Sequence, residues 1–273
     1  MRHVRGHVDT MKTISISTLS AMKENGEKFA AITAYDYTFS RLIENSSIEV
    51  SLVGDSLGNV IQGRDSTIPV TVDEMAYHTA AVKRGNNRSL LVSDMPFMSY
   101  STEVNALDNA AVIMQAGAQM VKLEGGEWLA DTVYLLSERG IPVCGHVGLT
   151  PQSVHKLGGY KVQGKEDAAA DQMIQEALIL EEAGADLMVI ECVPSSLGAA
   201  LSSALSIPVI GIGAGADTDG QVLVLHDMLG ISQRLPKFTK NFLAGKDSIQ
   251  EAITAYGNDV RSGAFPASEH CFK

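Results

Sequence analysis

The chain repeats a pattern of helix end, glycine and apolar strand, and this repeat constrains the fold more than any other feature. Residues 116–124 read Ala-Gly-Ala followed by an apolar run that ends on glutamate, and 183–191 repeat this at an offset of 67. Residues 141–145 start with Ile-Pro-Val and recur at 207–211, at an offset of 66. A glycine that ends a helix and a proline that starts a strand are both common. One further strand lies between each segment and its copy, so a helix-and-strand unit takes about 33 residues.

Period and length together predict one (β/α)8 barrel, a single domain over residues 1–273. Eight units of this size need about 264 residues, and the chain has 273. The expected strands are short and almost continuously apolar, as strands covered on both faces are; they span 29–36, 50–55, 89–94, 120–124, 142–147, 187–192, 208–213 and 221–226. The expected amphipathic helices include 73–84, 105–117, 127–139, 167–184 and 247–262. An open doubly wound sheet is the alternative, and it fits the count less well.

The N-terminal part of the chain is expected to contribute little beyond a plug. Ser17 to Asn25 predicts a short helix before the first strand, which would close the bottom of the barrel. Residues 1–10 are expected to form a disordered extension, with Met11 as an alternative start.

Composition excludes several classes of function. The net charge is −11 and basic residues are not clustered, which argues against nucleic-acid binding. We see no secretory signal and no apolar run near the roughly 18 residues of a membrane span. Three cysteines without a Cys-x-x-Cys pair favour a reducing cytoplasm.

Ionisable residues end nearly every expected strand. In a barrel of this type the catalytic groups lie at the C-terminal ends of the strands. A single polar residue there usually just begins a loop, but several that converge on one rim indicate a functional site. The residues in this position are Asp36, Asp55, Asp94, Lys122 with Glu124, His146 and Glu191.

Asp55 and Asp94 predict a metal site. Both end a Leu-Val-x-Asp segment on neighbouring strands, so we expect them at equivalent heights. Adjacent carboxylates repel each other unless a proton or a cation lies between them. Oxygen ligands favour a hard cation, and one Mg²⁺ is the expected ion, with Glu124 completing its shell directly or through water. The alternative is that the two aspartates only cap the loops that follow them.

Lys122 and Glu124 are two residues apart on one strand, so both side chains should point into the barrel. A lysine inside a barrel needs an anionic partner. Either Glu124 provides it, or Lys122 binds the carboxylate of a substrate. A Schiff-base lysine is the third possibility, which the neighbouring carboxylates disfavour because they would keep the amine protonated.

Glu191 is the expected general base. It occupies the position of Glu124 in its own repeat, and we expect it on the far side of the rim. Its apolar neighbours suit a carboxylate that takes up a proton from the substrate. His146 could orient a ligand or hold Glu191, or it could be structural. Ser56 can offer its hydroxyl and its backbone amide to a carboxylate.

These groups fit the chemistry of a 2-oxo acid. A hard cation would bind the carboxylate and keto oxygens and stabilise an enolate, while Glu191 removes a proton from the adjacent carbon. Aldol addition, isomerisation and carbon–carbon cleavage share this step, and the residues do not decide among them. A catalytically silent binding protein is a further alternative, but an unused cluster of buried like charges would only destabilise the fold.

Several longer motifs of the chain resemble those of the ketopantoate hydroxymethyltransferase family. They follow one another in order from about Ile14 to Phe272 and cover nearly the whole sequence. The strings are Val-Gly-Asp-Ser-Leu-Gly at 53–58, Asp-Ser-Thr-Ile-Pro-Val-Thr at 65–71, Asp-Met-Pro-Phe-Met at 94–98, Val-Lys-Leu-Glu-Gly-Gly at 121–126, Gly-His-Val-Gly-Leu-Thr-Pro-Gln-Ser at 145–153, Leu-Gly-Gly-Tyr-Lys-Val-Gln-Gly at 157–164, Glu-Cys-Val-Pro at 191–194 and Gly-Ile-Gly-Ala-Gly at 211–215.

The resemblance implies a barrel of the phosphoenolpyruvate/pyruvate group. It also implies a transferase that moves a hydroxymethyl group from 5,10-methylenetetrahydrofolate to 3-methyl-2-oxobutanoate, giving 2-dehydropantoate for pantothenate synthesis. Another metal-dependent lyase or mutase of the same group, acting on a 2-oxo acid, is the alternative. Members of the family are homo-oligomers, often decamers. The identity of the substrate comes only from this resemblance.

The resemblance also implies roles for individual residues. Asp55 and Asp94 would bind one Mg²⁺ per subunit, and Glu124 would contribute to the metal shell. Glu191 would accept the proton. The oxo acid would lie against Asp55, Ser56, Asp94, Lys122 and His146.

Overall fold

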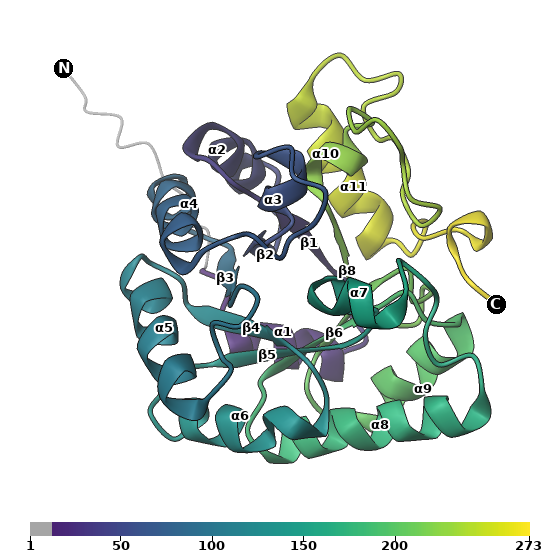
Figure 1. Cartoon of the computed structure of the whole chain (residues 1–273). Coiled ribbons are helices and arrows are strands. Elements are labelled where there is room, and N and C mark those ends of the chain that lie inside the picture. Colours follow the sequence, from purple (N-terminus) through teal and green to yellow (C-terminus); the bar gives the residue numbers. More distant parts are fainter. Residues whose placement is uncertain (1–12) are drawn as a thin grey trace.

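The computed structural model describes residues 13–273 as a closed barrel of eight parallel strands (Figure 1). The strands pair in sequence order, and β8 closes on β1 with Phe29 opposite Gly220. They are β1 (Phe29–Thr33), β2 (Val50–Val53), β3 (Leu90–Asp94), β4 (Met120–Glu124), β5 (Val143–Gly148), β6 (Leu187–Glu191), β7 (Val209–Ile212) and β8 (Gly220–Leu223). The predicted (β/α)8 fold is therefore confirmed. The expectation for residues 1–10 lies outside the described residues.

Most strands end earlier than the apolar pattern suggests. The first was expected to reach residue 36, but β1 ends at Thr33. Asp36 instead caps helix α2 (Tyr37–Asn45), because its carboxylate accepts a hydrogen bond from the amide of Phe39 at 2.9 Å. A carboxylate at a helix N-terminus satisfies an amide that has no partner within the helix. Asp36 thus has a structural role and does not belong to the group of rim residues described below.

The helices surround the barrel (Figure 1). The longer ones are α4 (Val72–Gly85), α5 (Glu103–Gln115), α6 (Ala130–Ser137), α8 (Asp167–Glu182), α9 (Ser195–Ala204) and α11 (Ile249–Arg261). Short segments lie between them: α3 (Leu57–Val60), η1 (Glu127–Leu129), η2 (Pro151–Ser153), α7 (Val154–Leu157), α10 (Leu225–Met228) and η3 (Ser268–His270). Among residues 13–273, no helix separates β7 from β8, so the units are less regular than the repeat implied. None of the helices described there is long and apolar enough to cross a lipid bilayer.

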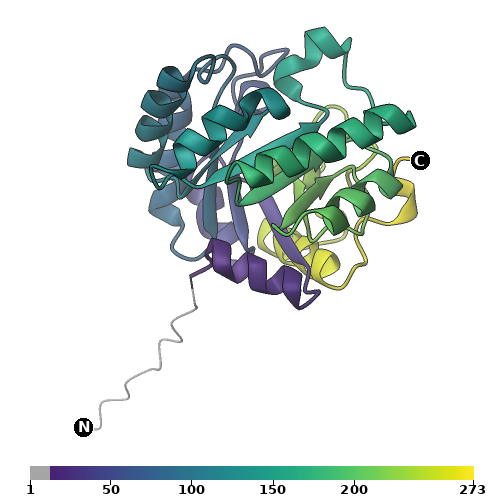
Figure 2. The ribbon, with the colours of Figure 1, turned by 90° about the horizontal axis from the view of Figure 1, so that it is seen from below.

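Helix α1 (Ile16–Glu24) closes the N-terminal end of the barrel, as the sequence predicted (Figure 2). Ser15 caps it by accepting a hydrogen bond from the amide of Thr18. Leu19 is buried and packs in the same apolar cluster as Phe29 at the start of β1. The ammonium of Lys23 lies 2.9 Å from Asp219 Oδ2, which ties the helix to the loop before β8.

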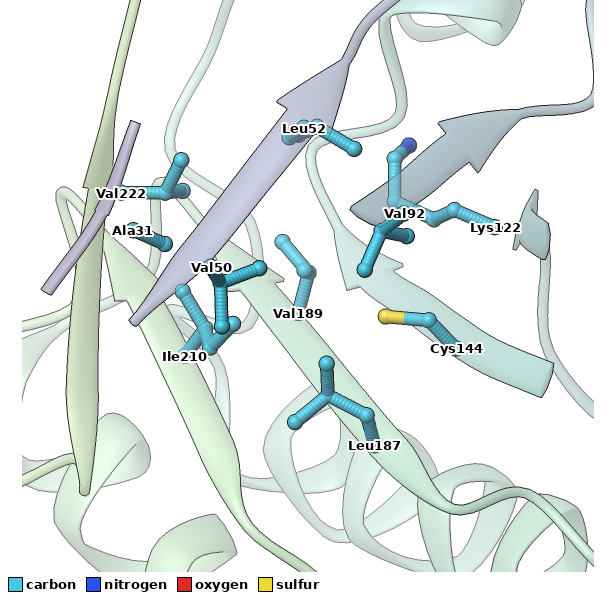
Figure 3. Close-up of a pocket in the computed structure, with 10 residues that line it drawn as sticks. All are labelled: Ala31, Val50, Leu52, Val92, Lys122, Cys144, Leu187, Val189, Ile210 and Val222. Carbon is cyan, nitrogen blue, oxygen red and sulfur yellow. The ribbon is translucent and has the colours of Figure 1, made fainter. Parts of the chain in front are cut away.

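The barrel interior is packed and apolar up to the level of the rim. Its side chains come from alternate positions of the strands, and Figure 3 shows ten of them around a cavity of about 10 Å³, room for one water molecule at most. A Cβ at Gly220 would lie 2.5 Å from the Phe29 ring, so a larger residue would not fit there. Lys122 is the charged residue among those ten, and it brings its stem into the interior beside Val92 and Cys144. A closed apolar floor therefore lies directly beneath the charged groups.

We expect Leu19→Ala to destabilise the barrel by about 2–5 kcal/mol, because it leaves a cavity between the plug and the barrel floor. Unfolding in denaturant at equal protein concentration measures the difference in free energy. Leu235→Ala is the control, since that side chain is 37% exposed. Equal stabilities for the two variants would show that α1 does not seal the barrel.

Candidate active site

Three carboxylates converge at the C-terminal rim of the barrel. Asp55 follows β2, Asp94 ends β3 and Glu124 ends β4. All three are buried, and one oxygen from each lies within 4.8 Å of the others. These three residues lie close together, as the sequence predicted.

Asp55 and Asp94 are not at the same height, in contrast to the expectation from their matching segments. The register pairs Val53 with Ser93, so Asp94 is level with Gly54 and Asp55 stands one residue further along. This stagger lets the backbone amide of Asp55 donate a hydrogen bond to Asp94 Oδ2 at 2.9 Å. The matching Leu-Val-x-Asp segments suggested equal heights because the register between two strands cannot be read from either strand alone.

Lys122 points into the barrel and lies in the middle of the cluster. Its ammonium is 3.1 Å from Asp94 Oδ1 and 3.3 Å from Glu124 Oε1. It is also 3.1 Å from Nδ1 of His146 on β5. The pairing with Glu124 that the sequence allowed is therefore present, and Asp94 joins it. A lysine with 4% exposure is tolerated there because carboxylates surround its charge.

His146 connects the cluster to Glu191. Its Nδ1 lies 3.4 Å from Glu124 Oε1, and its Nε2 lies 3.3 Å from Glu191 Oε2. Glu191 is thus separated from Glu124 by only one strand, and the expectation that it lies on the far side of the rim is wrong. The 67-residue offset spans two units of the repeat, which is a quarter of the barrel.

A close approach between β5 and β6 fixes the backbone of Glu191. Gly148 ends β5 with a φ of 93°, and a Cβ at this glycine would lie 2.3 Å from the carbonyl oxygen of Glu191. The amide of Leu149 donates to that same oxygen at 2.8 Å. Both the left-handed backbone and the lack of space require glycine at this position.

The charges in the cluster compete with burial. Burial, with the negative charges of Glu124 and Asp94, raises the pKa of Asp55 well above its usual value. Burial also raises the pKa of Asp94, although Lys122 opposes this. Burial disfavours the ammonium of Lys122, but Asp94, Glu124 and Asp55 outweigh it and raise the pKa of Lys122 well above its usual value. Lys122 is therefore a permanent cation, which makes it a poor nucleophile.

Glu124 and His146 lie against each other on the other side of Lys122. Burial opposes the charge on Glu124, but Lys122 and His146 together lower its pKa to about 2. Burial and Lys122 disfavour the imidazolium, yet the contacts with Glu124 and Glu191 raise the pKa of His146 to about 9. Each group therefore favours the charged form of the other.

The site has room in its charge balance for a divalent cation. Four carboxyl groups, those of Asp55, Asp94, Glu124 and Glu191, surround the ammonium of Lys122 and the imidazole of His146. Asp94 Oδ1 is buried and, within residues 13–273, has no hydrogen-bond partner apart from its ion contact with Lys122. An all-oxygen donor set with an excess of negative charge suits Mg²⁺. The residues present therefore fit the metal site that the sequence predicted.

Ser56 stands beside this cluster and is held by Tyr35, which the sequence analysis overlooked. The two hydroxyl oxygens are 2.8 Å apart. Tyr35 follows β1, so the contact joins the loops after two neighbouring strands. An aromatic residue at a strand end gave no signal because it reads equally well as part of the core.

Gln152 is the second residue that the sequence did not reveal. It lies in the loop after β5 and hydrogen-bonds to both Asp55 and Glu124, at 2.8 and 3.0 Å. It belongs to the quoted motif at 145–153, but an uncharged side chain six residues beyond His146 carried no chemical signal.

Comparison with known proteins assigns the chain to a family. The family model described as ketopantoate hydroxymethyltransferase matches residues 13–268. The chain belongs to this family. Its relatives include the 3-methyl-2-oxobutanoate hydroxymethyltransferase of Marinobacter nauticus, 59% identical over 261 residues, with 95% of this chain and 99% of the relative covered. The protein of the same name from Cronobacter sakazakii is 58% identical over 263 residues, covering 96% of this chain and 100% of the relative.

Solved structures of lower sequence identity have a similar fold. A phosphonopyruvate hydrolase solved with oxalate and Mg²⁺ superposes with a TM-score of 0.62 and is 15% identical, covering 94% of this chain and 99% of the other. A phosphoenolpyruvate phosphomutase from Streptomyces platensis gives 0.61 at 12% identity, covering 79% and 83%. At these identities the likeness concerns the barrel architecture.

We expect Lys122→Met to lower the stability of the metal-free protein by about 3–5 kcal/mol, because the carboxylates lose their buried cation. Mg²⁺ should then raise the melting temperature of this variant more than that of the unmodified protein, since no ammonium competes with it. Thermal unfolding with chelator and with Mg²⁺ measures both effects. Lys240→Met is the control, because its ion pair with Asp259 is on the surface. Identical Mg²⁺ shifts in all three proteins would contradict a shared site.

Proposed function

We propose that this chain transfers a hydroxymethyl group from 5,10-methylenetetrahydrofolate to 3-methyl-2-oxobutanoate through an enolate, giving 2-dehydropantoate for pantothenate synthesis. Full-length relatives near 59% identity carry the name of this activity. The observation that carries the mechanism is the buried set of Asp55, Asp94 and Glu124 beside Lys122. Such a set matches a substrate that presents adjacent carboxylate and keto oxygens.

We propose that Lys122 and Ser56 bind the carboxylate of the oxo acid. The ammonium of Lys122 is held protonated by its neighbours, so it can attract an anion at any pH near neutrality. The hydroxyl of Ser56 is oriented by Tyr35 at 2.8 Å and can turn its proton toward a ligand. Asp55, Asp94 and His146 line the same space and would lie against the substrate.

Glu191 is the group that takes the proton from the substrate. Its side chain is 13% exposed, so it faces the open rim while its neighbours are buried. His146 lies against Glu191 Oε2 at 3.3 Å and leaves Oε1 for the transfer. A positioned carboxylate base contributes about 10²–10⁴ in rate.

Asp55 and Asp94 would hold Mg²⁺ in this mechanism, and Glu124 would contribute to its shell. When bound there, the ion would supply Lewis-acid stabilisation of the developing enolate oxygen. The protein keeps the three carboxylates together and dry, which strengthens their attraction for a cation. Lys122 and His146 balance part of their charge, which makes the buried cluster compatible with folding.

The protein is proposed to act in the cytoplasm as a homo-oligomer, with a decamer suggested by the family. Its three cysteines, Cys144, Cys192 and Cys271, are free, which suits a reducing compartment. Sedimentation of the purified protein measures the oligomer directly, and a monomer would contradict this part of the proposal.

We expect Glu191→Gln to bind 3-methyl-2-oxobutanoate but to exchange its C3 proton with solvent about 10²–10⁴-fold more slowly, because the amide cannot accept the proton. Proton exchange in deuterated buffer, followed by NMR without folate, isolates this step. Glu182→Gln on the exposed end of α8 is the matched control. A rate within a few-fold of the unmodified protein would show that Glu191 is not the base.

Chelation of Mg²⁺ should abolish this exchange, and the affinity for Mg²⁺ should increase with pH. The sign follows from Asp55 and Asp94, whose raised pKa values mean that protons are displaced when a cation binds. Calorimetry at about pH 6 and about pH 8 in buffers of different ionisation enthalpy measures both the affinity and the proton release. Exchange that survives exhaustive chelation, or an affinity that does not change with pH, would contradict the proposed metal site.

A further inference from the structure

Gln152 joins the loops that follow three neighbouring strands. Its side-chain nitrogen donates to Asp55 Oδ2 at 2.8 Å and to the carbonyl oxygen of Met95 at 3.0 Å. Its backbone amide donates to Glu124 Oε2 at 3.0 Å, and its side-chain oxygen accepts a hydrogen bond from the hydroxyl of Tyr100. The residue is 5% exposed, so no water replaces these bonds when they are lost.

The orientation of this amide follows from its partners. The atom between Asp55 and Met95 faces a carboxylate and a carbonyl oxygen, which only accept hydrogen bonds, so it must be the donor nitrogen. The other atom faces the hydroxyl of Tyr100, which can donate to oxygen. A flipped amide would lose the bonds to Asp55 and Met95 together.

Gln152 therefore holds one oxygen of two different carboxylates. The backbone amide of Gln152 donates to Glu124 Oε2, so that Glu124 Oε1 faces Lys122 and His146. The side-chain amide of Gln152 donates to Asp55 Oδ2, and Asp55 Oδ1 makes no bond to Gln152. Groups that hydrogen-bond to ligating side chains fix their orientation and commonly change metal affinity 10–100-fold.

We propose that Gln152 is the positioning residue of the cation site. It fixes the directions of the Asp55 and Glu124 carboxylates before a divalent cation arrives, and Tyr100 in turn fixes Gln152. This inference rests on the proposed function, because it assumes that the carboxylates bind Mg²⁺. It assigns Gln152 no contact with the substrate and no part in proton transfer.

The local structure keeps Gln152 in place. It lies within η2, whose first residue is Pro151, and Val154, two residues further along the chain, is buried. Tyr100 is braced from outside by Trp128, with the two rings stacked at 6.2 Å between centroids. Gln152 is thus held in place by the backbone of η2 and by Tyr100, which Trp128 supports.

The test is the Mg²⁺ affinity of full-length Gln152→Met, measured by calorimetry beside the unmodified protein. Methionine keeps the length of the side chain and removes the donor to Asp55, so we expect the dissociation constant to rise about 10–100-fold. Proton exchange of the oxo acid should recover at saturating Mg²⁺, which a damaged catalytic group would not allow. Gln221→Met is the matched control, since this buried glutamine donates to Gly215 and Thr218 away from the cluster.

Each outcome bears on one proposal. If the unmodified protein does not bind Mg²⁺, the proposed function fails and this inference with it. If the unmodified protein binds Mg²⁺ and Gln152→Met binds it equally well, or if Gln221→Met is weakened as much, the positioning role is overturned while the proposed function stands. Should Gln152→Met not fold, Tyr100→Phe decides: a dissociation constant raised a few-fold supports the role, and an unchanged one overturns it.

Discussion

Repulsion among buried carboxylates is the constraint on which the rest of the structure depends. Asp55, Asp94 and Glu124 lie within a few ångströms of one another and away from water, where like charges repel far more strongly than in solution. Lys122 and His146 offset part of this charge, and the remaining negative charge is compatible with a divalent cation at the rim. The arrangement of the site is therefore governed by electrostatics, because each carboxylate needs a neighbouring positive or hydrogen-bonding group.

The barrel makes such an arrangement possible because it separates stability from chemistry. Below the rim, apolar side chains fill the interior and α1 seals the open end. Above it, the consecutive strands β2 to β6 deliver the charged residues to a common space, and the backbone hydrogen bonds of the barrel fix their positions. The free energy gained from burying the apolar floor offsets the unfavourable concentration of charge at the top.

The sequence was informative where a residue type or a period has one physical meaning. The recurrence of Ala-Gly-Ala before an apolar run led to the barrel, and carboxylates at strand ends led to the buried acidic cluster. It was silent on Gln152 and Tyr35, because an amide and a phenol acquire a role only from the atoms they meet in space. It also misplaced Glu191 around the rim and Asp55 along it, since neither barrel closure nor strand register is encoded within one segment.

The one-residue stagger between Asp55 and Asp94 turns two copies of a short segment into unlike partners. The peptide nitrogen of Asp55 donates to the carboxylate of Asp94, which also lies against the ammonium of Lys122, whereas the carboxylate of Asp55 accepts a hydrogen bond from Gln152. The two aspartates therefore have different surroundings although they lie side by side. Two segments of similar sequence can in this way yield distinct chemical environments through their register alone.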